Sequence, residues 1–454
     1  MGDSKIRVTA PSLLRVEVAR TFALAWPVVL TQVGTVSMSL VDLAMVAPLG
    51  ADAIGAVGIG SSAFWLAATI LFGVLLALDP LISQAWGAGE RSRVGALAWQ
   101  GGYIGIIGGA IACLCCLDTR ALFDFVEQPA EVARLADQYL FGLSAGFIPF
   151  FVFVTGRSLL SGMSIVRPVM VIILIANGFN VVADYALIRG EFGLPALGVY
   201  GAGLATTTTR WMMTAMLLLY VASLKVGLDL RPRLPDLSRL RRIFSLGLPI
   251  GLQNFAEFGV FSAAGVFAGW LGATALAAHQ VALNLVSFAF MVPVGVSVAV
   301  AVRVGHEIGA GNPDGAALAG RVGIAIGAGF MALSGIVFLS VPEVLAAAIG
   351  ADGDVFALAT QLLRIAAAFQ IADGIQVVAA GALRGAGDTR SSMVANLVAH
   401  WCFGLPLGYV LAFKIDLGVV GLWWGLTGSL VFAAVLLLRL FLRGGWRRIG
   451  RVHA

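Results

Sequence analysis

The sequence predicts an all-α integral membrane protein, and three features of its composition carry this prediction. Only 12% of the 454 residues are charged, whereas a soluble globular domain carries about 25%. The mean hydropathy is +0.96 and 59% of the residues are hydrophobic, which is more than a water-facing domain of this size can hide. The 57 glycines suit membrane helices, which pack closely through small residues. The same composition excludes a disordered chain, a coiled coil and a small disulfide-linked scaffold.

Twelve apolar stretches follow one another along the chain, and most are long enough to cross a hydrocarbon core of about 30 Å. They lie at residues 21–47, 53–80, 94–117, 135–156, 169–188, 198–224, 243–268, 273–302, 316–342, 355–383, 393–413 and 418–438. The first stretch is full length and has no small-residue cleavage site behind it, so it is expected to be a retained helix and not a signal peptide. We therefore expect twelve transmembrane helices.

The basic residues are distributed asymmetrically about these spans. With the N-terminus placed in the cytoplasm, most Lys and Arg residues fall in cytoplasmic stretches. Those on the outer side of the membrane are only Arg120, Arg134, Arg189 and Lys414. This positive-inside pattern predicts a multi-pass protein of the inner (cytoplasmic) membrane with both termini cytoplasmic. The pI near 9.3 then follows from topology, and no nucleic-acid partner is expected.

An internal repeat organises the chain when the sequence is shifted against itself by 222 residues. Residues 49–54 fall on 271–276, and the glycine-rich turn Gly87-Ala88-Gly89 falls on Gly309-Ala310-Gly311. Six spans separate equivalent positions, so both copies enter the membrane in the same direction. Parallel repeats of this kind are transporter architecture, with the substrate path between the halves.

The repeat predicts five segments. We expect a cytoplasmic N-terminal segment at 1–20, an N-lobe of six helices at 21–224, a linker at 225–242, a C-lobe of six helices at 243–438 and a basic cytoplasmic tail at 439–454. The linker is polar and contains Pro232, Pro235 and six basic residues, which is typical of a loop that joins two lobes in the cytoplasm.

Ionisable residues inside the spans are the first candidates for function, because the bilayer makes them costly unless they face the interior, carry a proton or hold a cation. Asp42 and Asp184 each lie about five residues from the outer end of a span, at a depth of roughly 7 Å. Asn180 precedes Asp184 by one helical turn, and Asn177 lies nearby. These oxygen-bearing side chains predict a site for Na⁺ or a proton in the first lobe.

Glu257 and Asp373 lie near the middle of their spans in the second half of the chain. They predict either a second cation site or a negative field that attracts a cationic substrate. For each of the four acids, the alternative is an interhelical hydrogen bond that only fixes packing. The matched depths of the two pairs favour a functional role.

Other polar residues inside spans are candidates for contact with the substrate, with satisfied packing as the alternative. They are His279, Gln280, Asn284 and His400. Arg210 could serve as a counter-ion for the acids, whereas Arg364 is expected to extend its side chain to the membrane surface. No catalytic group, metal cluster or cofactor loop is recognisable, so we expect neither an enzyme nor a cofactor.

Several runs resemble one family. They are Val41-Asp42-Leu43-Ala44-Met45, Gln84-Ala85-Trp86-Gly87-Ala88-Gly89, Ala278-His279-Gln280-Val281-Ala282-Leu283-Asn284 and Ala380-Gly381-Ala382-Leu383-Arg384-Gly385-Ala386-Gly387-Asp388. Over about residues 20–440 they are similar to the multidrug and toxic compound extrusion (MATE) transporters. The resemblance implies two six-helix lobes that form a V around a central cavity, and antiport of organic cations or drugs against Na⁺ or H⁺.

The resemblance also implies roles for individual residues. Glu257 and Asp373 match the acids of the second lobe in the NorM-like branch, and Asp42 and Asn180 match its polar first-lobe site. Asp184 departs from that pattern, because NorM-like members often carry Asn there, and is similar to the DinF-like branch. The coupling ion, Na⁺ or H⁺, and the lobe that binds it therefore stay open.

A flippase for lipid-linked oligosaccharide or another lipid is the alternative function. Such proteins tend to line their cavity with Arg or Lys that bind phosphate, whereas Asp and Glu dominate inside these spans. The acidic interior favours a cationic cargo. We expect a monomer whose partners are organic cations or drugs and the surrounding membrane lipids.

Overall fold

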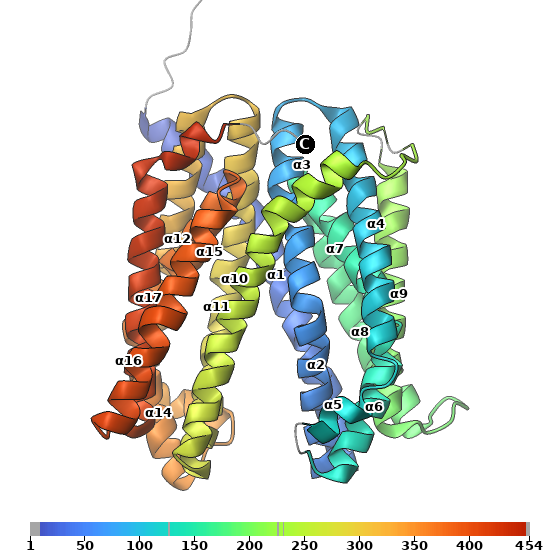
Figure 1. Ribbon diagram of the computed structural model, residues 1–454, viewed down its shortest axis with the longest axis vertical. Coiled ribbons are helices and arrows are strands. Elements are labelled where there is room, and N and C mark those ends of the chain that lie inside the picture. Colours follow the sequence, from blue (N-terminus) through green and yellow to red (C-terminus); the bar gives the residue numbers. More distant parts are fainter. Residues whose placement is uncertain (1–9, 126–127, 225–226, 230, 451–454) are drawn as a thin grey trace, which may run out of the picture. The chain divides into compact units, whose positions relative to one another are not determined.

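The computed structural model describes residues 10–125, 128–224, 227–229 and 231–450. The predicted N-terminal segment, linker and C-terminal tail therefore lie partly outside the described residues. Within the described ranges the regular elements are all helices (Figure 1). This confirms the predicted all-α class.

The helices follow the predicted spans closely. Those of the first half are α1 (Ala10–Val46), α2 (Ala51–Leu76), α3 (Leu78–Gly87), α4 (Arg91–Cys115), α5 (Arg120–Phe125), α6 (Ala130–Ser144), α7 (Phe147–Gly162), α8 (Arg167–Arg189) and α9 (Gly198–Ser223). Those of the second half are α10 (Leu237–Trp270), α11 (Ala273–Gly309), α12 (Pro313–Ser340), α13 (Pro342–Ala348), α14 (Gly353–Gly385), α15 (Thr389–Leu397), α16 (Leu405–Tyr409) and α17 (Gly418–Arg443). Two π-helical segments, Val398–Gly404 and Val410–Lys414, flank α16.

Most of these helices meet the requirements of a membrane span. Nine segments of the described residues are long and apolar enough, and the bent pair α6 and α7 makes ten. The remaining two predicted spans correspond to α9 and α10, which are 26 and 34 residues long. Polar residues lower their hydropathy, among them four consecutive threonines before Arg210 in α9. The chain is a multi-pass membrane protein, and for α9 and α10 the crossing stays a prediction.

The bend between α6 and α7 is 51° and lies inside the predicted span 135–156. Gly146 at this bend is closely packed, because a Cβ atom there would lie 2.9 Å from both the Leu143 carbonyl oxygen and Thr207 Oγ1. Pro149 follows within the first turn of α7, where the absence of its N–H group costs no helical hydrogen bond. The span is therefore broken where glycine and proline permit it.

The internal repeat is visible in the backbone of its turns. Gly89 and Gly311 both have φ +77°, and Gly198 and Gly418 both have φ +57°, a left-handed conformation that glycine adopts without strain. The hydrogen bonds agree as well. The N–H of Glu90 donates to the carbonyl five residues earlier at 2.9 Å, and the N–H of Asn312 does the same at 2.8 Å.

The described chain divides into two compact units, and each has its own core. The N-unit contains Leu30–Phe255, and the C-unit contains the residues before Leu30 together with those from Ala256 onward. The divisions between the two packing units fall inside α1 and α10, and the lobe boundaries expected from the sequence stay a prediction. Both helices contain a proline shortly before the division, Pro27 in α1 and Pro249 in α10, and proline weakens the helix at this point because it removes one hydrogen bond.

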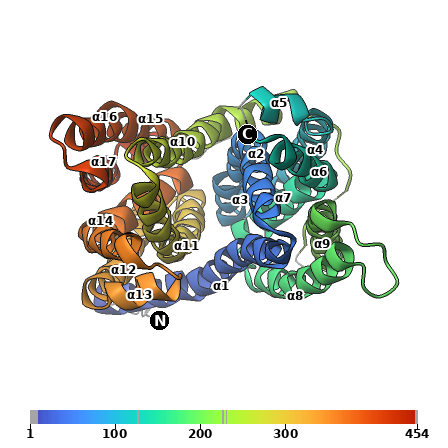
Figure 2. The ribbon, with the colours of Figure 1, turned by 90° about the horizontal axis from the view of Figure 1, so that it is seen from below.

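In the C-unit, α11, α12 and α14 pack against one another, as Figure 2 shows from below. Small side chains dominate this contact, with Ala299, Ala319 and Ala382 at most 2% exposed. In the N-unit, α8 packs on α9, α6 on α9, and α4 on α7. These contacts hold the polar side chains of α8 and α9 at fixed positions.

Replacing Gly203 by Ala should destabilise the N-unit. A Cβ atom at Gly203 on α9 would lie 2.3 Å from the Tyr139 carbonyl oxygen of α6, so the two backbones would have to move apart. Overpacking of this kind costs about 1–3 kcal/mol, and the apparent melting temperature of the detergent-solubilised protein should fall. Gly102→Ala is the matched control, because nothing lies within 4 Å of the added methyl group. Equal melting temperatures for the two variants would contradict this account of the packing.

Candidate functional site

Asp42 lies at the centre of a buried polar cluster in the N-unit. Its side chain is 3% exposed, and those of Asn180 and Asp184 are fully buried. Thr206 Oγ1 of α9 donates a hydrogen bond to Asp42 Oδ2 at 2.7 Å. Asn180 and Asp184, one turn apart on α8, face the same carboxyl group. The structure thus brings together Asp42, Asn180 and Asp184, and their role in binding a cation stays a prediction.

Several polar atoms of this cluster have no hydrogen-bond partner among the described residues. They are Asp42 Oδ1, both carboxylate oxygens of Asp184 and both amide atoms of Asn180. Burying a polar group without a partner costs about 1–3 kcal/mol, and native structures rarely leave such groups unexplained. The oxygens among them are also ligands that hard cations prefer. The cluster is therefore chemically suited to a proton or a small cation.

Arg210 and Tyr139 surround the cluster. The Arg210 guanidinium lies over the Phe64 ring at 4.1 Å and over the Phe150 ring at 5.2 Å, and its role as a counter-ion for the acids stays a prediction. The Tyr139 hydroxyl is hydrogen-bonded with Ser61 Oγ at 3.3 Å. Sequence reasoning missed Thr206, although it precedes Arg210 by one helical turn and its hydroxyl is unusual in an apolar helix.

Asn177 makes its contacts elsewhere on α8. Its Nδ2 donates to the Gly34 carbonyl oxygen of α1 at 3.0 Å and to the Ile173 carbonyl oxygen at 2.9 Å. Gly34 precedes Asp42 by eight residues, roughly two helical turns. Asn177 therefore holds α1 against α8 two turns away from the cluster. A part in cation coupling stays a prediction for this residue.

A second polar cluster lies in the C-unit around Glu257 of α10 and Asp373 of α14. The charges of the two acids act on each other, and Gln376, one turn after Asp373, faces the Glu257 carboxyl group. Gln376 Nε2 also donates to Asn396 Oδ1 at 2.8 Å. Gln376 and Asn396 are 1% exposed and were not predicted, although their spacings from Asp373 and His400 follow the helical period.

His400 lies in the π-helical segment Val398–Gly404 and is 2% exposed. Its Nδ1 is 2.5 Å from Ser429 Oγ, whose hydroxyl donates to the Ala399 carbonyl oxygen at 3.1 Å. The other ring nitrogen, Nε2, is buried and has no hydrogen-bond partner among the described residues. In the next position, Trp401 Nε1 donates to the Ala256 carbonyl oxygen at 2.9 Å. The π-helical segment is thus tied to the helix that carries Glu257.

The other candidates lie outside this cluster. Gln280 and Asn284 are exposed on α11, one helical turn apart. His279 is fully buried and accepts a hydrogen bond from Trp423 Nε1 at 3.2 Å, which favours the packing interpretation. Arg364 is exposed and forms an ion pair with Glu343 at 2.7 Å, in agreement with the prediction that its side chain extends to the surface.

The sequence profile of the MatE family matches residues 27–186 and residues 249–410, once in each copy of the repeat and over more than half of the chain. The chain belongs to the MatE family. The MATE signatures of the sequence are thereby confirmed, and so is the expectation that the protein is a transporter and not an enzyme.

Curated relatives of this MATE chain span almost its whole length. It is 37% identical to the probable multidrug resistance protein NorM of Rhodopseudomonas palustris, with 94% of this chain and 92% of the relative covered. It is 36% identical to the multidrug resistance protein NorM of Burkholderia vietnamiensis, with 96% of each covered. These relatives place the chain among multidrug efflux transporters.

Solved structures of MATE transporters share the fold. The eukaryotic MATE transporter AtDTX14 superposes with a TM-score of 0.87 at 21% identity and covers 96% of this chain and 98% of its own. The bent form of the Vibrio cholerae MATE transporter VcmN superposes with a TM-score of 0.86 at 20% identity, with 96% and 98% covered. At these identities the likeness concerns the fold.

Proposed function

We propose that this MATE chain is a secondary active antiporter that exports organic cations or amphiphilic drugs in exchange for H⁺ or Na⁺. The observation that carries the proposal is the buried cluster of Asp42, Asn180 and Asp184, in which Asp42 Oδ1, Asn180 Oδ1 and both Asp184 carboxylate oxygens lack partners among the described residues. Two carboxyl groups that face each other out of water repel when both are ionised. A proton or a cation between them relieves this repulsion, so the cluster binds and releases a coupling ion. No other cofactor takes part in this scheme.

The two clusters have separate tasks in this proposal. Asp42, Asn180 and Asp184 bind the coupling ion, and Asn177 holds the helices that carry them. Glu257 and Asp373 attract a cationic drug or provide a second cation site, and the buried Nε2 of His400 forms a hydrogen bond with the cargo. Gln280 and Asn284 contact the cargo from their exposed face of α11.

The proposal includes the location and orientation of the protein. We place the chain in the inner membrane as a monomer surrounded by lipid, with both termini in the cytoplasm and no nucleic-acid partner. The excess of Lys and Arg on one side of the spans supports this orientation. The alternative of a flippase for lipid-linked oligosaccharide is not supported by the NorM relatives.

Proteoliposomes loaded with ethidium test the proposal. An inward gradient of Na⁺ and an inward gradient of H⁺ are imposed separately, and dye efflux is followed by fluorescence. We expect one of the two gradients alone to drive efflux above the rate of protein-free liposomes, which identifies the coupling ion. If neither gradient drives ethidium or another organic cation, coupled antiport of cations is wrong.

A further inference from the structure

A polar pocket lies where the second and third spans meet the water. It has a volume of about 560 Å³, and it opens between the turn that joins α3 to α4 and the linker before α10. The described residues that line it are Gly89, Glu90, Arg91, Ser92, Arg93, Arg233 and Arg239. Four of the seven are arginines, and all seven belong to the N-unit.

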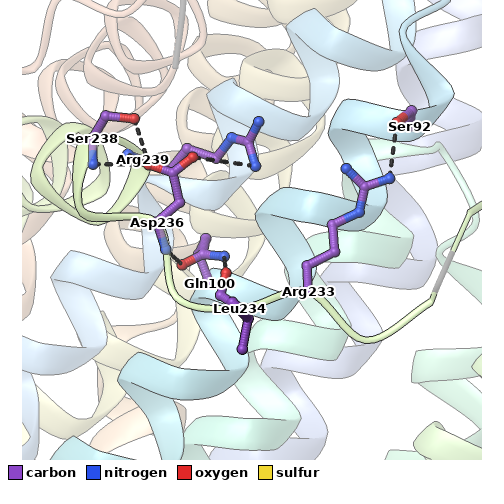
Figure 3. A network of polar contacts seen from close by, with 7 residues as sticks. All are labelled: Ser92, Gln100, Arg233, Leu234, Asp236, Ser238 and Arg239. Carbon is purple, nitrogen blue, oxygen red and sulfur yellow. Dashed lines mark hydrogen bonds and ion pairs between the residues drawn. The ribbon is translucent and has the colours of Figure 1, made fainter.

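The linker side of this pocket is held in place by α4. The fully buried Gln100 donates from Nε2 to the Leu234 carbonyl oxygen at 3.2 Å and accepts the N–H of Asp236 at 2.9 Å (Figure 3). The Tyr103 hydroxyl donates to the Arg233 carbonyl oxygen at 2.7 Å. These three bonds fix the backbone next to Arg233 and Arg239, so this side of the pocket has its shape before a ligand binds.

Asp236 fixes the start of α10 at the same place. Its carboxylate accepts hydrogen bonds from the Ser238 hydroxyl at 2.5 Å and from the Ser238 N–H at 2.9 Å. The bond from the Ser238 hydroxyl and that from the Arg239 N–H hold the pKa of the Asp236 carboxyl below its usual value. The Asp236 carboxylate is therefore ionised at neutral pH and keeps its hydrogen bonds to the start of α10. These bonds are lost only as the pH falls through this lowered pKa.

The arginines of the pocket differ in how they are paired. Three of them pair with a nearby acid: Arg93 with Glu90 at 2.8 Å, Arg233 with Asp229 at 2.7 Å and Arg239 with Asp236 at 3.5 Å. These pairs are partly exposed and local in sequence, so they are weak. The fourth, Arg91, lies over the Trp86 ring at 3.1 Å, and its buried Nη1 has no hydrogen-bond partner among the described residues.

The fold does not require these arginines, as the repeat shows. The equivalent turn of the C-unit has the same φ of +77° at Gly311 as Gly89 has here. Yet Pro313, Gly315 and Glu17 stand at the positions of Arg91, Arg93 and Arg239.

Glu17, which stands at the position of Arg239, is paired with a residue of its own unit. Glu17 accepts two hydrogen bonds from Arg303, at 2.9 Å and 2.7 Å. Positive charge at the membrane surface also orients the chain, but orientation does not require four arginines around one cavity.

We propose that this pocket binds a phosphate-bearing anion, either the headgroup of an anionic lipid or soluble phosphate. Guanidinium groups match phosphate oxygens in charge and in planar geometry, and the Ser92 hydroxyl, which lies 2.9 Å from an Arg233 nitrogen, supplies a further polar contact. The pocket lies beside the ends of two membrane spans, where basic pockets bind lipid headgroups. Glu90 opposes the anion and weakens its binding.

Native mass spectrometry of the purified full chain tests the site with phosphatidylglycerol, which is anionic. Phosphatidylcholine serves as the comparison, because its phosphate is balanced by a quaternary ammonium group and its net charge is zero. The double variant Arg91→Gln/Arg239→Gln should bind phosphatidylglycerol about 25-fold more weakly, since each arginine near a lipid headgroup contributes about fivefold. Glu90→Gln should bind it more tightly, a gain that misfolding does not produce. Arg447→Gln is the matched control, because Arg447 also pairs with an acid and lies near a tryptophan ring, Asp314 at 3.1 Å and Trp446 at 5.5 Å.

A second arm separates the two sources of phosphate. Inorganic phosphate is added to the wild type and the double variant, and the melting temperature is measured. Stabilisation of the wild type alone, with unchanged lipid binding, supports the site and identifies soluble phosphate as its ligand. Equal responses of the wild type and the double variant to both probes would overturn the proposal. So would an equal loss of phosphatidylglycerol binding in Arg447→Gln, because the effect would then follow overall charge.

Discussion

Replacing Asp42 by Asn should abolish gradient-driven export of ethidium from proteoliposomes. The amide has nearly the shape of the carboxyl group and can still accept the hydrogen bond from Thr206, but it carries no negative charge and takes up no proton. The cluster then keeps only the Asp184 carboxyl opposite Asn180, and the repulsion that a coupling ion relieves is gone. Efflux should fall to the rate of protein-free liposomes under either gradient.

The control for this variant is Asp52→Asn. Asp52 is an exposed acid in the first turn of α2, so its substitution removes the same charge without touching the buried cluster. Export at the wild-type rate by correctly inserted Asp42→Asn would show that Asp42 only fixes packing. The assignment of the first-lobe site would then be wrong.

Thr206→Val separates the charge of Asp42 from its orientation. Valine has nearly the shape of threonine but donates no hydrogen bond, and hydrogen bonds to charged groups contribute about 1.5–3 kcal/mol. The ion concentration that half-saturates transport should therefore change about tenfold or more, while the maximal rate remains measurable. An unchanged ion dependence would show that Thr206 has no part in the ion site.

Much of the fold could be predicted because membrane helices have a strong composition signal. Apolar stretches, glycine turns and the repeat are all local or pairwise properties of the sequence, and the structure places a helix at each predicted span. The division of α1 near Pro27 and of α10 near Pro249 could not be predicted in the same way. It depends on which unit each half of a continuous helix packs against.

The candidate sites show the same limit at the level of side chains. Asp42 and Asp184 stand out because an acid inside a membrane span is costly, and Asn180 follows from helical spacing. Their neighbour Thr206 depends on the rotation of α9 about its axis, which sequence alone does not define. For the same reason Asn177 was grouped with Asp42, whereas its amide binds the backbone at Gly34.

Binding of a cationic dye should weaken most when Glu257 and Asp373 are neutralised together. Each carboxylate attracts a cation at about 4 Å with roughly 1 to 4 kcal/mol, depending on the effective dielectric constant. Even the lower value weakens binding about fivefold for Glu257→Gln or Asp373→Asn alone, and about 25-fold for the double variant. Dye fluorescence at equilibrium, measured without a gradient, reports this affinity separately from ion coupling.

Glu343→Gln is the matched control for this double variant. Glu343 is an exposed acid of the same C-unit, paired with Arg364, so it tests whether any lost negative charge lowers dye affinity. If the double variant binds the dye as tightly as the wild type and keeps its ion dependence, both proposed roles of the pair are wrong. Glu257 would then serve only to fix the packing of α10 beside Gln376, which binds Asn396 and so joins α14 to α15, and the cargo would have to be attracted elsewhere.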